Sequence, residues 1–354
     1  MVLLLILAIM AFAVAFRLSQ RAIGGLLVGL WAAGVLAHLA LPAGHPVLVQ
    51  IGGSLAGWLV VGGAVALALG YRAGLRWLQA RARPAPVAEA TPKGAFSPAE
   101  LERYARHIML REVGGPGQAR LKAARVLVVG AGGLGSPILL YLAAAGVGTI
   151  GVADDDAVSS SNLQRQVIHT DERIGMAKTR SAEMTMKALN PFITVTQHPQ
   201  RVTAENAAEL LAGYDLVLDG TDNFAARYLL NSACIAAGKP LLSGAISQWE
   251  GQLSLYDPAR GAPCYACVFP EAPAAGLAPS CAEAGVMGAL PGVIGAMMAG
   301  EAIKEITGAG QTLRGRLILH DALWGESRVI EIAKNPDCPH CSAMQKGLLG
   351  EQHG

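Results

Sequence analysis

The chain has 354 residues and a formal net charge of +2, and its basic residues form no long run, which argues against a nucleic-acid-binding protein. Its six cysteines are too few for a disulfide framework in a chain of this length. The 52% hydrophobic content is unevenly distributed, because residues 1–71 carry only two charged side chains, Arg17 and Arg21. We therefore expect two unlike parts, an apolar N-terminal segment and a soluble domain.

Two nearly uncharged stretches, residues 22–42 and 46–70, are each long enough at about 1.5 Å per residue to cross a hydrocarbon core of about 30 Å. We predict that both are transmembrane helices. Residues 2–16 are also apolar but short for a span, and they resemble the apolar region of a signal peptide. Because no small-residue cleavage site precedes Arg17 and further apolar segments follow, we expect an uncleaved anchor of two or three helices over residues 1–81.

The basic residues around these stretches predict their orientation. They are Arg17 and Arg21 before the first stretch and Arg72, Arg76, Arg81 and Arg83 after the second, whereas the connection at 41–47 has only His45. Since cytoplasmic flanks are enriched in lysine and arginine, we expect the chain after residue 72 to lie on the cytoplasmic face of the inner cell membrane. Residues 82–96 are rich in proline and alanine and predict an extended linker. Residues 97–100, SPAE, then fit the N-cap, first-turn proline and capping-box glutamate of a helix.

A glycine-rich turn follows the first strand predicted in the soluble part. Residues 125–129, RVLVV, form the strand, and GAGGLG leads into an alanine-rich helix. Gly130, Gly132 and Gly135 match the G-x-G-x-x-G pattern of a phosphate-binding turn. The next strand ends at Asp154, about 20 residues later, where an acidic side chain can bind a ribose hydroxyl. We predict an α/β fold, a Rossmann-like sheet with helices on both faces. An NAD-dependent dehydrogenase would share these features, so the nucleotide stays open.

Polar residues after Asp154 favour ATP. The segments DDAVSSSNLQRQ and GMAK bring Asn162, Arg165 and Lys178 next to the predicted site. When a carboxylate attacks the α-phosphate of ATP and pyrophosphate leaves, cations must offset the charge that accumulates on the phosphates, whereas hydride transfer needs no such cluster. Taken singly, Arg165 and Lys178 also fit ordinary surface charges.

Asp222 and Asn223 follow a further predicted strand, YDLVLDG, at the end where open α/β sheets bind ligands. Asp222 is expected to hold Mg²⁺ against the phosphates, or to cap the helix that begins near Phe224. The two roles can coexist.

Four cysteines form two Cys-x-x-Cys pairs, Cys264 with Cys267 and Cys338 with Cys341. This spacing lets both sulfurs of a pair bind one tetrahedral ion, so we predict a structural zinc site. A redox pair is the alternative, but it would need only one such motif. With four protein ligands the zinc would have no open position and would not take part in catalysis. Cys234 lies in an apolar helix and is expected to be a buried hydrophobic residue.

Residues 97–343 resemble the ubiquitin-activating-enzyme-like adenylyltransferases that include MoeB, ThiF and HesA, most closely those that act on molybdopterin synthase. The resemblance rests on RYARHI at 103–108, GAGGLG at 130–135, Asp154, SNLQRQ at 161–166, Lys178, TDN at 221–223, CYAC at 264–267, CAEAGV at 281–286 and CPHC at 338–341. It implies a homodimeric enzyme in which Arg106 reaches into the partner's ATP site.

The resemblance also implies roles for individual residues. Gly130, Gly132, Gly133, Gly135 and Asp154 would hold the adenosine portion; Ser161, Asn162, Arg165, Lys178 and Asn223 would bind the rest of the nucleotide, and Asp222 would take Mg²⁺. Cys281 matches the position of the family's acyl-accepting cysteine, and chemistry and packing are both open for it. Zinc at the four paired cysteines agrees with the family.

The resemblance further implies that the enzyme uses ATP to adenylate the C-terminal glycine of a ubiquitin-like sulfur carrier of the MoaD type, in molybdopterin biosynthesis. A ThiS-type carrier in thiamine biosynthesis is the alternative, and an NAD-dependent oxidoreductase or a catalytically silent membrane scaffold is less favoured by the polar cluster. Because few residues follow Cys341, we expect a separate protein to donate the sulfur and residues 344–354 to form a flexible tail.

Overall fold

The structure is a computed structural model that describes residues 20–82, 96–274 and 284–342. The chain divides into two compact units, Met1–Ala90 and Thr91–Gly354, and the boundary falls in the segment predicted to be a linker. The first unit contains three described helices, α2 (Gln20–Ala40), α3 (Pro46–Ile51) and α4 (Leu55–Ala82). The short apolar segment at 2–16 lies outside the described residues.

Two tryptophans hold α2 against α4. Trp31 donates a hydrogen bond from Nε1 to the carbonyl oxygen of Trp58 at 2.7 Å. Gly34 and Gly62 face the two rings so closely that an added Cβ would lie 2.6 Å from Trp58 and 2.4 Å from Trp31, respectively. Glycine at these positions therefore permits the close approach of the two helices.

The prediction of one continuous helix over 46–70 is wrong. Gly52 and Gly53 adopt positive φ angles of 70° and 79°, which end α3 and cannot continue a right-handed helix. Ser54 then begins a new helix, since its Oγ accepts a hydrogen bond from the backbone N–H of Gly57 at 3.2 Å. The apolar stretch thus splits into α3 and the much longer α4.

Within the described residues, length and composition qualify one segment to cross a bilayer, the 21-residue stretch Leu55–Leu75 of α4. None of its residues is fully buried by the described part of the chain, and Leu67 is 77% exposed. The apolar part of α2, Gly25–Ala40, is shorter than a span requires. The expectation of two or three spanning helices therefore has support for one segment, with bounds that differ from the predicted ones.

The second unit is built on an eight-stranded mixed sheet with the order β3-β2-β1-β4-β5-β6-β7-β8. The strands are β1 (Arg125–Val129), β2 (Thr149–Ala153), β3 (Thr194–His198), β4 (Leu216–Asp219), β5 (Leu241–Ile246), β6 (Glu250–Tyr256), β7 (Arg316–Asp321) and β8 (Glu326–Glu331). β1 to β5 run parallel to one another, and β6 to β8 continue the sheet as antiparallel strands. The order reverses at β1, which lies between β2 and β4, and ligands bind at such switch points.

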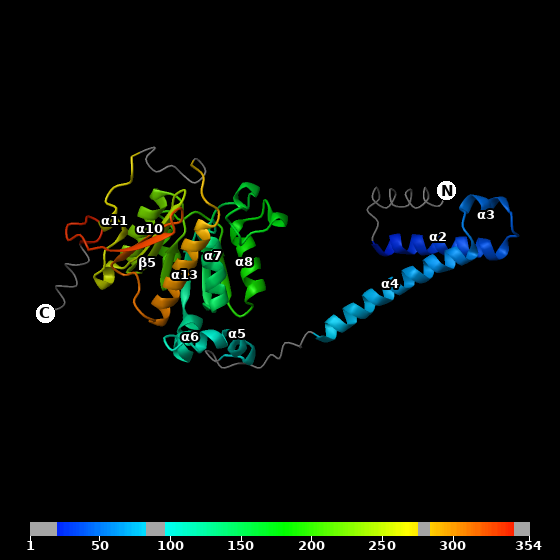
Figure 1. Ribbon diagram of the computed structural model, residues 1–354, viewed down its shortest axis with the longest axis horizontal. Coiled ribbons are helices and arrows are strands. Elements are labelled where there is room, and N and C mark those ends of the chain that lie inside the picture. The colour runs from blue at the N-terminus through cyan, green and yellow to red at the C-terminus, as the bar shows by residue number, and fades with distance from the viewer. Residues whose placement is uncertain (1–19, 83–95, 275–283, 343–354) are drawn as a thin grey trace. The chain divides into compact units, whose positions relative to one another are not determined.

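The helices of this unit cover both faces of the sheet, as predicted. They are α5 (Pro98–Ile108), α6 (Gly114–Ala123), α7 (Gly135–Ala145), α8 (Lys178–Leu189), α9 (Ala207–Ala212), α10 (Phe224–Ala237), α11 (Tyr265–Val268) and α13 (Leu290–Thr307), together with the 3₁₀ turns Ser160–Asn162, Asp171–Arg173 and Pro258–Arg260. α7 lies between α8 and α13, and all three pack across one face (Figure 1). α9, α10 and α11 contribute to the core on the other face.

The alternation of side chains along each strand builds these two cores. Val126 and Val128 of β1 point into the core beneath α7 and α13, whereas Leu127 and Val129 point into the core beneath α9 and α10. Because both faces of the sheet are covered at β1, its sequence is a nearly continuous hydrophobic run, as is typical of parallel strands. The predicted capping box of α5 is confirmed, because Ser97 Oγ accepts from the N–H of Glu100 and Glu100 accepts from the N–H of Ser97.

Candidate functional site

A cleft of about 820 Å³ opens at the carboxyl ends of the parallel strands. Its walls come from residues within 129–134 after β1, 153–156 after β2, 200–202 after β3, 220–230 after β4 and 246–248 after β5, with Arg165, Gln166, Lys178, Ala284 and Gly285. The cleft therefore lies across the switch point of the sheet, where the glycine turn and Asp154 led us to expect a nucleotide.

The three glycines of the turn differ in whether the surrounding structure excludes a side chain. Gly130 has φ 93°, and an added Cβ would lie 2.9 Å from the carbonyl oxygen of Gly220. Gly135, the first residue of α7, faces the carbonyl oxygen of Gly130 so closely that a Cβ there would lie 1.9 Å away. A Cβ added at Gly132 would meet only Gln166 Nε2, at an ordinary van der Waals distance of 3.5 Å. The turn is thus compact, and its backbone borders the cleft.

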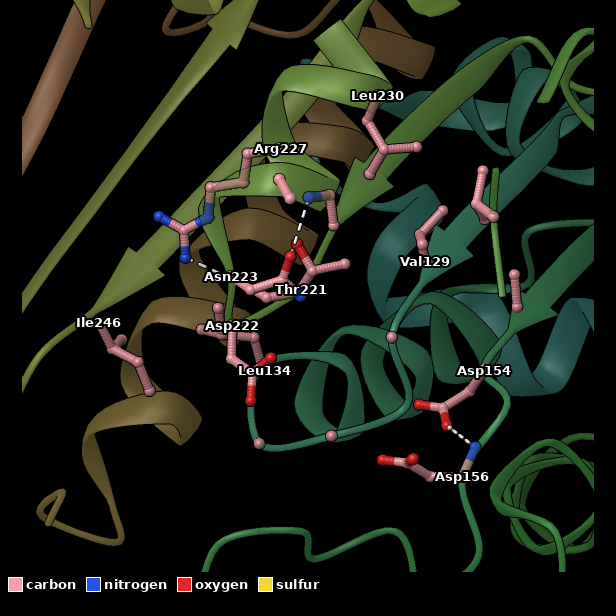
Figure 2. Close-up of a pocket in the computed structure, with 18 of the residues that line it drawn as sticks. Val129, Leu134, Asp154, Asp156, Thr221, Asp222, Asn223, Arg227, Leu230 and Ile246 are labelled. Carbon is pink, nitrogen blue, oxygen red and sulfur yellow. Dashed lines mark hydrogen bonds between the residues drawn. The ribbon is translucent and has the colours of Figure 1, made fainter. Parts of the chain in front are cut away.

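Asp154 holds the glycine turn in place. Its carboxylate accepts hydrogen bonds from the backbone N–H of Ala131 at 2.7 Å and from that of Asp156 at 2.9 Å, the second of which is drawn in Figure 2. Burial raises the pKa of this carboxyl, and the nearby Lys178 ammonium and the two backbone N–H groups oppose that rise. Each oxygen keeps a further acceptor direction, so binding a ribose hydroxyl is compatible with these bonds.

Lys178 begins α8, and only 4% of the residue is exposed. Its Nζ lies 2.7 Å from a carboxylate oxygen of Asp156 and 4.0 Å from one of Asp154. The two aspartates therefore fix a cation at the edge of the cleft. An ammonium in this position can bind a phosphate oxygen, which is the chemistry expected for it from the sequence.

The SNLQRQ segment brings Arg165 to the cleft through Asn162. The Arg165 guanidinium donates to Asn162 Oδ1 at 2.7 Å, and the backbone N–H of Arg165 bonds to the carbonyl of Asn162 at 3.1 Å. Arg165 lines the cleft, whereas Ser161 and Asn162 do not. Asn162 is thus placed to orient Arg165.

Of the two roles considered for Asp222, the structure gives helix capping to its neighbour Asn223. Asn223 is the N-cap of α10, since its Oδ1 accepts from the N–H of Ala226 at 2.9 Å. Asp222 lines the cleft with an exposed carboxylate and forms no ion pair within 4.0 Å among the described residues. The prediction that Asp222 caps the helix is wrong, and its carboxylate is left available for a cation.

Several predicted site residues are absent from the cleft walls in the described structure: Arg106, Gly135, Ser161 and Asn162. Arg106 is exposed on α5, so its predicted role in a partner's ATP site stays a prediction. Cys281 lies outside the described residues. Cys234 is 2% exposed in α10, and burial raises the pKa of its thiol to about 12, which agrees with a packing role.

Two residues were not predicted from the sequence, Arg227 in the cleft wall and His169 against the glycine turn. Arg227 is 6% exposed in α10 and lines the cleft. His169 bonds to the carbonyl oxygen of Ala131 in the glycine turn and to Ser181 Oγ, both at 2.9 Å, and burial lowers the pKa of its imidazole. A lone arginine between apolar residues in FAARYLL was the available signal for Arg227. His169 had none, since its partners are 38 and 12 residues away.

The four paired cysteines form a separate candidate metal centre. Their sulfurs lie within 4.8 Å of one another, and neighbouring sulfurs are 3.8, 3.7 and 3.5 Å apart. A tetrahedral Zn²⁺ with Zn–S bonds of about 2.3 Å requires sulfurs about 3.8 Å apart. Burial raises the pKa of the Cys264 and Cys341 thiols, so a cation is needed to stabilise their thiolates. The donor set thus fits a closed structural zinc site.

Comparison with known proteins agrees with this geometry. The sulfur carrier protein adenylyltransferase of Thermus thermophilus is 50% identical over 246 residues, which cover 68% of this chain and 91% of that protein. The probable adenylyltransferase/sulfurtransferase MoeZ of Mycobacterium tuberculosis is 51% identical over 256 residues, covering 72% of this chain and 65% of that protein. A crystal structure of E. coli MccB with ATP shares the fold, with 21% identity, a TM-score of 0.59 and coverage of 68% and 74%. The ThiF family matches residues 104–340, and the chain belongs to that family.

Proposed function

We propose that the chain uses ATP to adenylate the C-terminal carboxylate of a ubiquitin-like sulfur-carrier protein. The observation that carries the proposal is the cleft, where the glycine turn, Asp154, Lys178, Arg165 and Asp222 converge from separate parts of the chain. The name of the Thermus thermophilus relative, a sulfur carrier protein adenylyltransferase, supports the same reaction and the same class of partner.

In the proposed reaction, a carboxylate oxygen of the carrier attacks the α-phosphorus of ATP. A bond forms between that oxygen and phosphorus, the bond from phosphorus to the bridging oxygen breaks, and pyrophosphate leaves with the electron pair. Arg165 and Lys178 offset the negative charge that accumulates on the phosphates. Asp156 holds the Lys178 ammonium in position at 2.7 Å, so little reorganisation is needed when charge develops.

Asp222 is the residue that we propose to bind Mg²⁺. Its carboxylate is exposed in the cleft, and oxygen ligands are those that Mg²⁺ prefers. Asp222 would hold the ion in the cleft, and the bound ion would supply positive charge that offsets the charge of the phosphates.

The choice of carrier and the assembly belong to the same proposal. We favour a MoaD-type carrier of molybdopterin biosynthesis over a ThiS-type carrier, a separate protein as sulfur donor, and a homodimer in which Arg106 reaches the partner's cleft. We also propose that α4 attaches the enzyme to the inner membrane with the cleft in the cytoplasm, because its apolar segment Leu55–Leu75 is long enough to span and has no residue fully buried by the described part of the chain.

Carrier-dependent exchange of labelled pyrophosphate into ATP tests the proposed reaction. The full chain should catalyse the exchange with a MoaD-type carrier, and Asp222→Ala should lower its rate by about 10²-fold or more because the phosphates lose their cation. Zinc content, measured on the same samples, should be unchanged, since Asp222 is not part of the cysteine cluster. If neither carrier type supports exchange, the reaction is wrong; turnover of NAD(H) would then favour an oxidoreductase, and carrier binding without turnover a scaffold. Full exchange by Asp222→Ala would refute only the magnesium role.

A further inference from the structure

Arg227 is a buried cation at one end of the cleft. It lies in the first turns of α10 and is 6% exposed, yet it is one of the residues that line the cleft. Figure 2 places its guanidinium on the same side as Ile246, at the end of β5, and away from Asp154 and Asp156. Asp222 lies between these two groups in that view. In this view the cleft therefore has a second end, away from Asp154 and Asp156.

The guanidinium is only partly satisfied by the chain. One terminal nitrogen donates to the carbonyl oxygen of Thr221 at 3.1 Å, and the group also interacts with the Tyr265 hydroxyl and lies 5.6 Å from the centre of the Phe224 ring. Its Nε is buried and has no hydrogen-bond partner among the described residues. These contacts orient the side chain, but none of them supplies a negative charge.

No carboxylate of the described residues forms an ion pair with Arg227 within 4.0 Å. The buried carboxylate of Asp219 is engaged elsewhere, because one oxygen accepts from Thr221 at 2.6 Å and the other from Ser243 at 2.7 Å. A buried charge without a counter-ion is costly in a low-dielectric site. A ligand anion in the cleft would remove that cost.

The surroundings of Arg227 fit a single carboxylate better than a polyphosphate. Ile246, an apolar residue of the cleft wall, lies on the same side as Arg227 in Figure 2, whereas Lys178 and Arg165 lie on the glycine-turn side. One planar guanidinium next to apolar side chains matches the end of a polypeptide, whose terminal carboxylate accepts two parallel N–H bonds.

We propose that Arg227 binds the C-terminal carboxylate of the carrier protein before it reacts, an assignment that rests on the proposed function and adds a specificity residue to it. The pairing orients the carboxylate so that one oxygen can approach the α-phosphorus. Once the acyl-adenylate has formed, that carboxyl group no longer carries a charge, and its attraction to Arg227 weakens. The contact therefore distinguishes the unreacted carrier from the product.

A double-mutant cycle on binding tests this contact directly. A MoaD-type carrier with its natural C-terminal carboxylate is compared with the same carrier ending in a carboxamide, each titrated calorimetrically into the wild-type chain and into Arg227→Gln. An unreactive ATP analogue, α,β-methylene-ATP, is present throughout. Amidation should weaken binding to the wild type by about 10- to 100-fold, the strength of a charge-assisted hydrogen bond. With Arg227→Gln, carboxylate and carboxamide carriers should bind equally weakly. An equal amidation penalty in both proteins would overturn the assignment.

Further variants separate this role from a structural one. Arg227→Lys keeps the charge but not the planar pair of donors, so it should show an intermediate amidation penalty and remain informative if Arg227→Gln unfolds. Arg260→Gln is the matched control, an arginine that is 65% exposed and outside the cleft, and should keep the full penalty. In pyrophosphate exchange, Arg227→Lys should raise the KM for carrier and leave the KM for ATP unchanged. A raised KM for ATP alone would instead mean that Arg227 serves the nucleotide. Wild-type exchange without any amidation penalty would sink this assignment and leave the proposed function standing.

Discussion

The cleft and the four-cysteine cluster lie in the same unit, yet they differ in how much of each site the chain itself completes. All four donors of the cluster come from the chain, and three of them, Cys264, Cys338 and Cys341, are fully buried. The cleft keeps an exposed carboxylate at Asp222 and a buried guanidinium at Arg227 without an ionic partner among the described residues. The first arrangement suits a structural ion, and the second suits ligands that enter and leave.

Removing one cysteine of the cluster should have the largest effect on stability. We expect Cys338→Ser to lose its zinc and to lower the free energy of unfolding by about 4 kcal/mol or more, because the ion links residues 264–267 to residues 338–341. Metal analysis and chemical denaturation measure the two effects. At a temperature where the variant is folded, its KM for ATP should stay near that of the wild type, since none of the four cysteines lines the cleft.

Cys234→Ser is the control for this prediction. Cys234 is also buried, at 2% exposure, but it lies outside the cluster, so the variant should keep a full complement of zinc. If Cys338→Ser retained both its zinc and its stability, the cluster would not be a metal site, and the contrast with the cleft would fail.

A substitution in the glycine turn should have the next largest effect on the free energy of unfolding. Gly135→Ala would place a Cβ 1.9 Å from the carbonyl oxygen of Gly130, so the turn must open. We expect a loss of roughly 2–4 kcal/mol in the free energy of unfolding, as for other backbone clashes, and a raised KM for ATP. Gly132→Ala is the matched control, because its Cβ would meet only Gln166 Nε2 at 3.5 Å and should change stability by less than about 0.5 kcal/mol. Equal losses of stability in both variants would mean that the backbone of the turn adopts a different conformation from the one described.

Sequence spacing predicted the four-cysteine cluster fully but the cleft only in part. The two Cys-x-x-Cys pairs encode their geometry locally, so only the meeting of the pairs depends on the fold. The G-x-G-x-x-G motif placed Gly130, Gly132 and Gly135 correctly but treated them alike, whereas only two of them exclude a side chain. His169 could not be predicted, because its partners are 38 and 12 residues away and no local motif joins them. Arg227 stood out only as a lone arginine in FAARYLL, and its interaction with Tyr265 and its place in the cleft wall depend on the fold.

The fold class followed from alternating strand and helix patterns, since buried parallel strands such as β1 give continuous apolar runs. The N-terminal unit was less predictable. Hydropathy predicted a single helix over 46–70, because glycine within an apolar stretch does not by itself end a helix. The helix ends at Gly52 and Gly53 because both adopt positive φ angles, which hydropathy does not reveal.

The smallest expected effect concerns how the free energy of unfolding depends on pH through His169, next to the glycine turn. His169 bonds to the carbonyl of Ala131, and burial lowers its pKa in the folded chain below the ordinary 6.5. The unfolded state therefore binds a proton first as the pH falls, and the stabilisation that His169 contributes above about pH 6.5 is lost as the pH falls from there towards the lower folded pKa.

We expect His169→Gln to reduce the fall in the free energy of unfolding between pH 7 and pH 5, measured by urea denaturation, because Gln does not titrate. Zinc binding also weakens as thiolates take up protons, but this loss is common to wild type and variant and cancels in their difference. His198, whose pKa is lowered by burial and which bonds to Tyr214, gives a comparison within the same sheet. His198→Gln should flatten the same pH profile without changing the KM for ATP, whereas His169→Gln should change both, because of these two histidines His169 is the one that bonds to the glycine turn. A profile unchanged by His169→Gln would mean that the imidazole is not held neutral behind the turn.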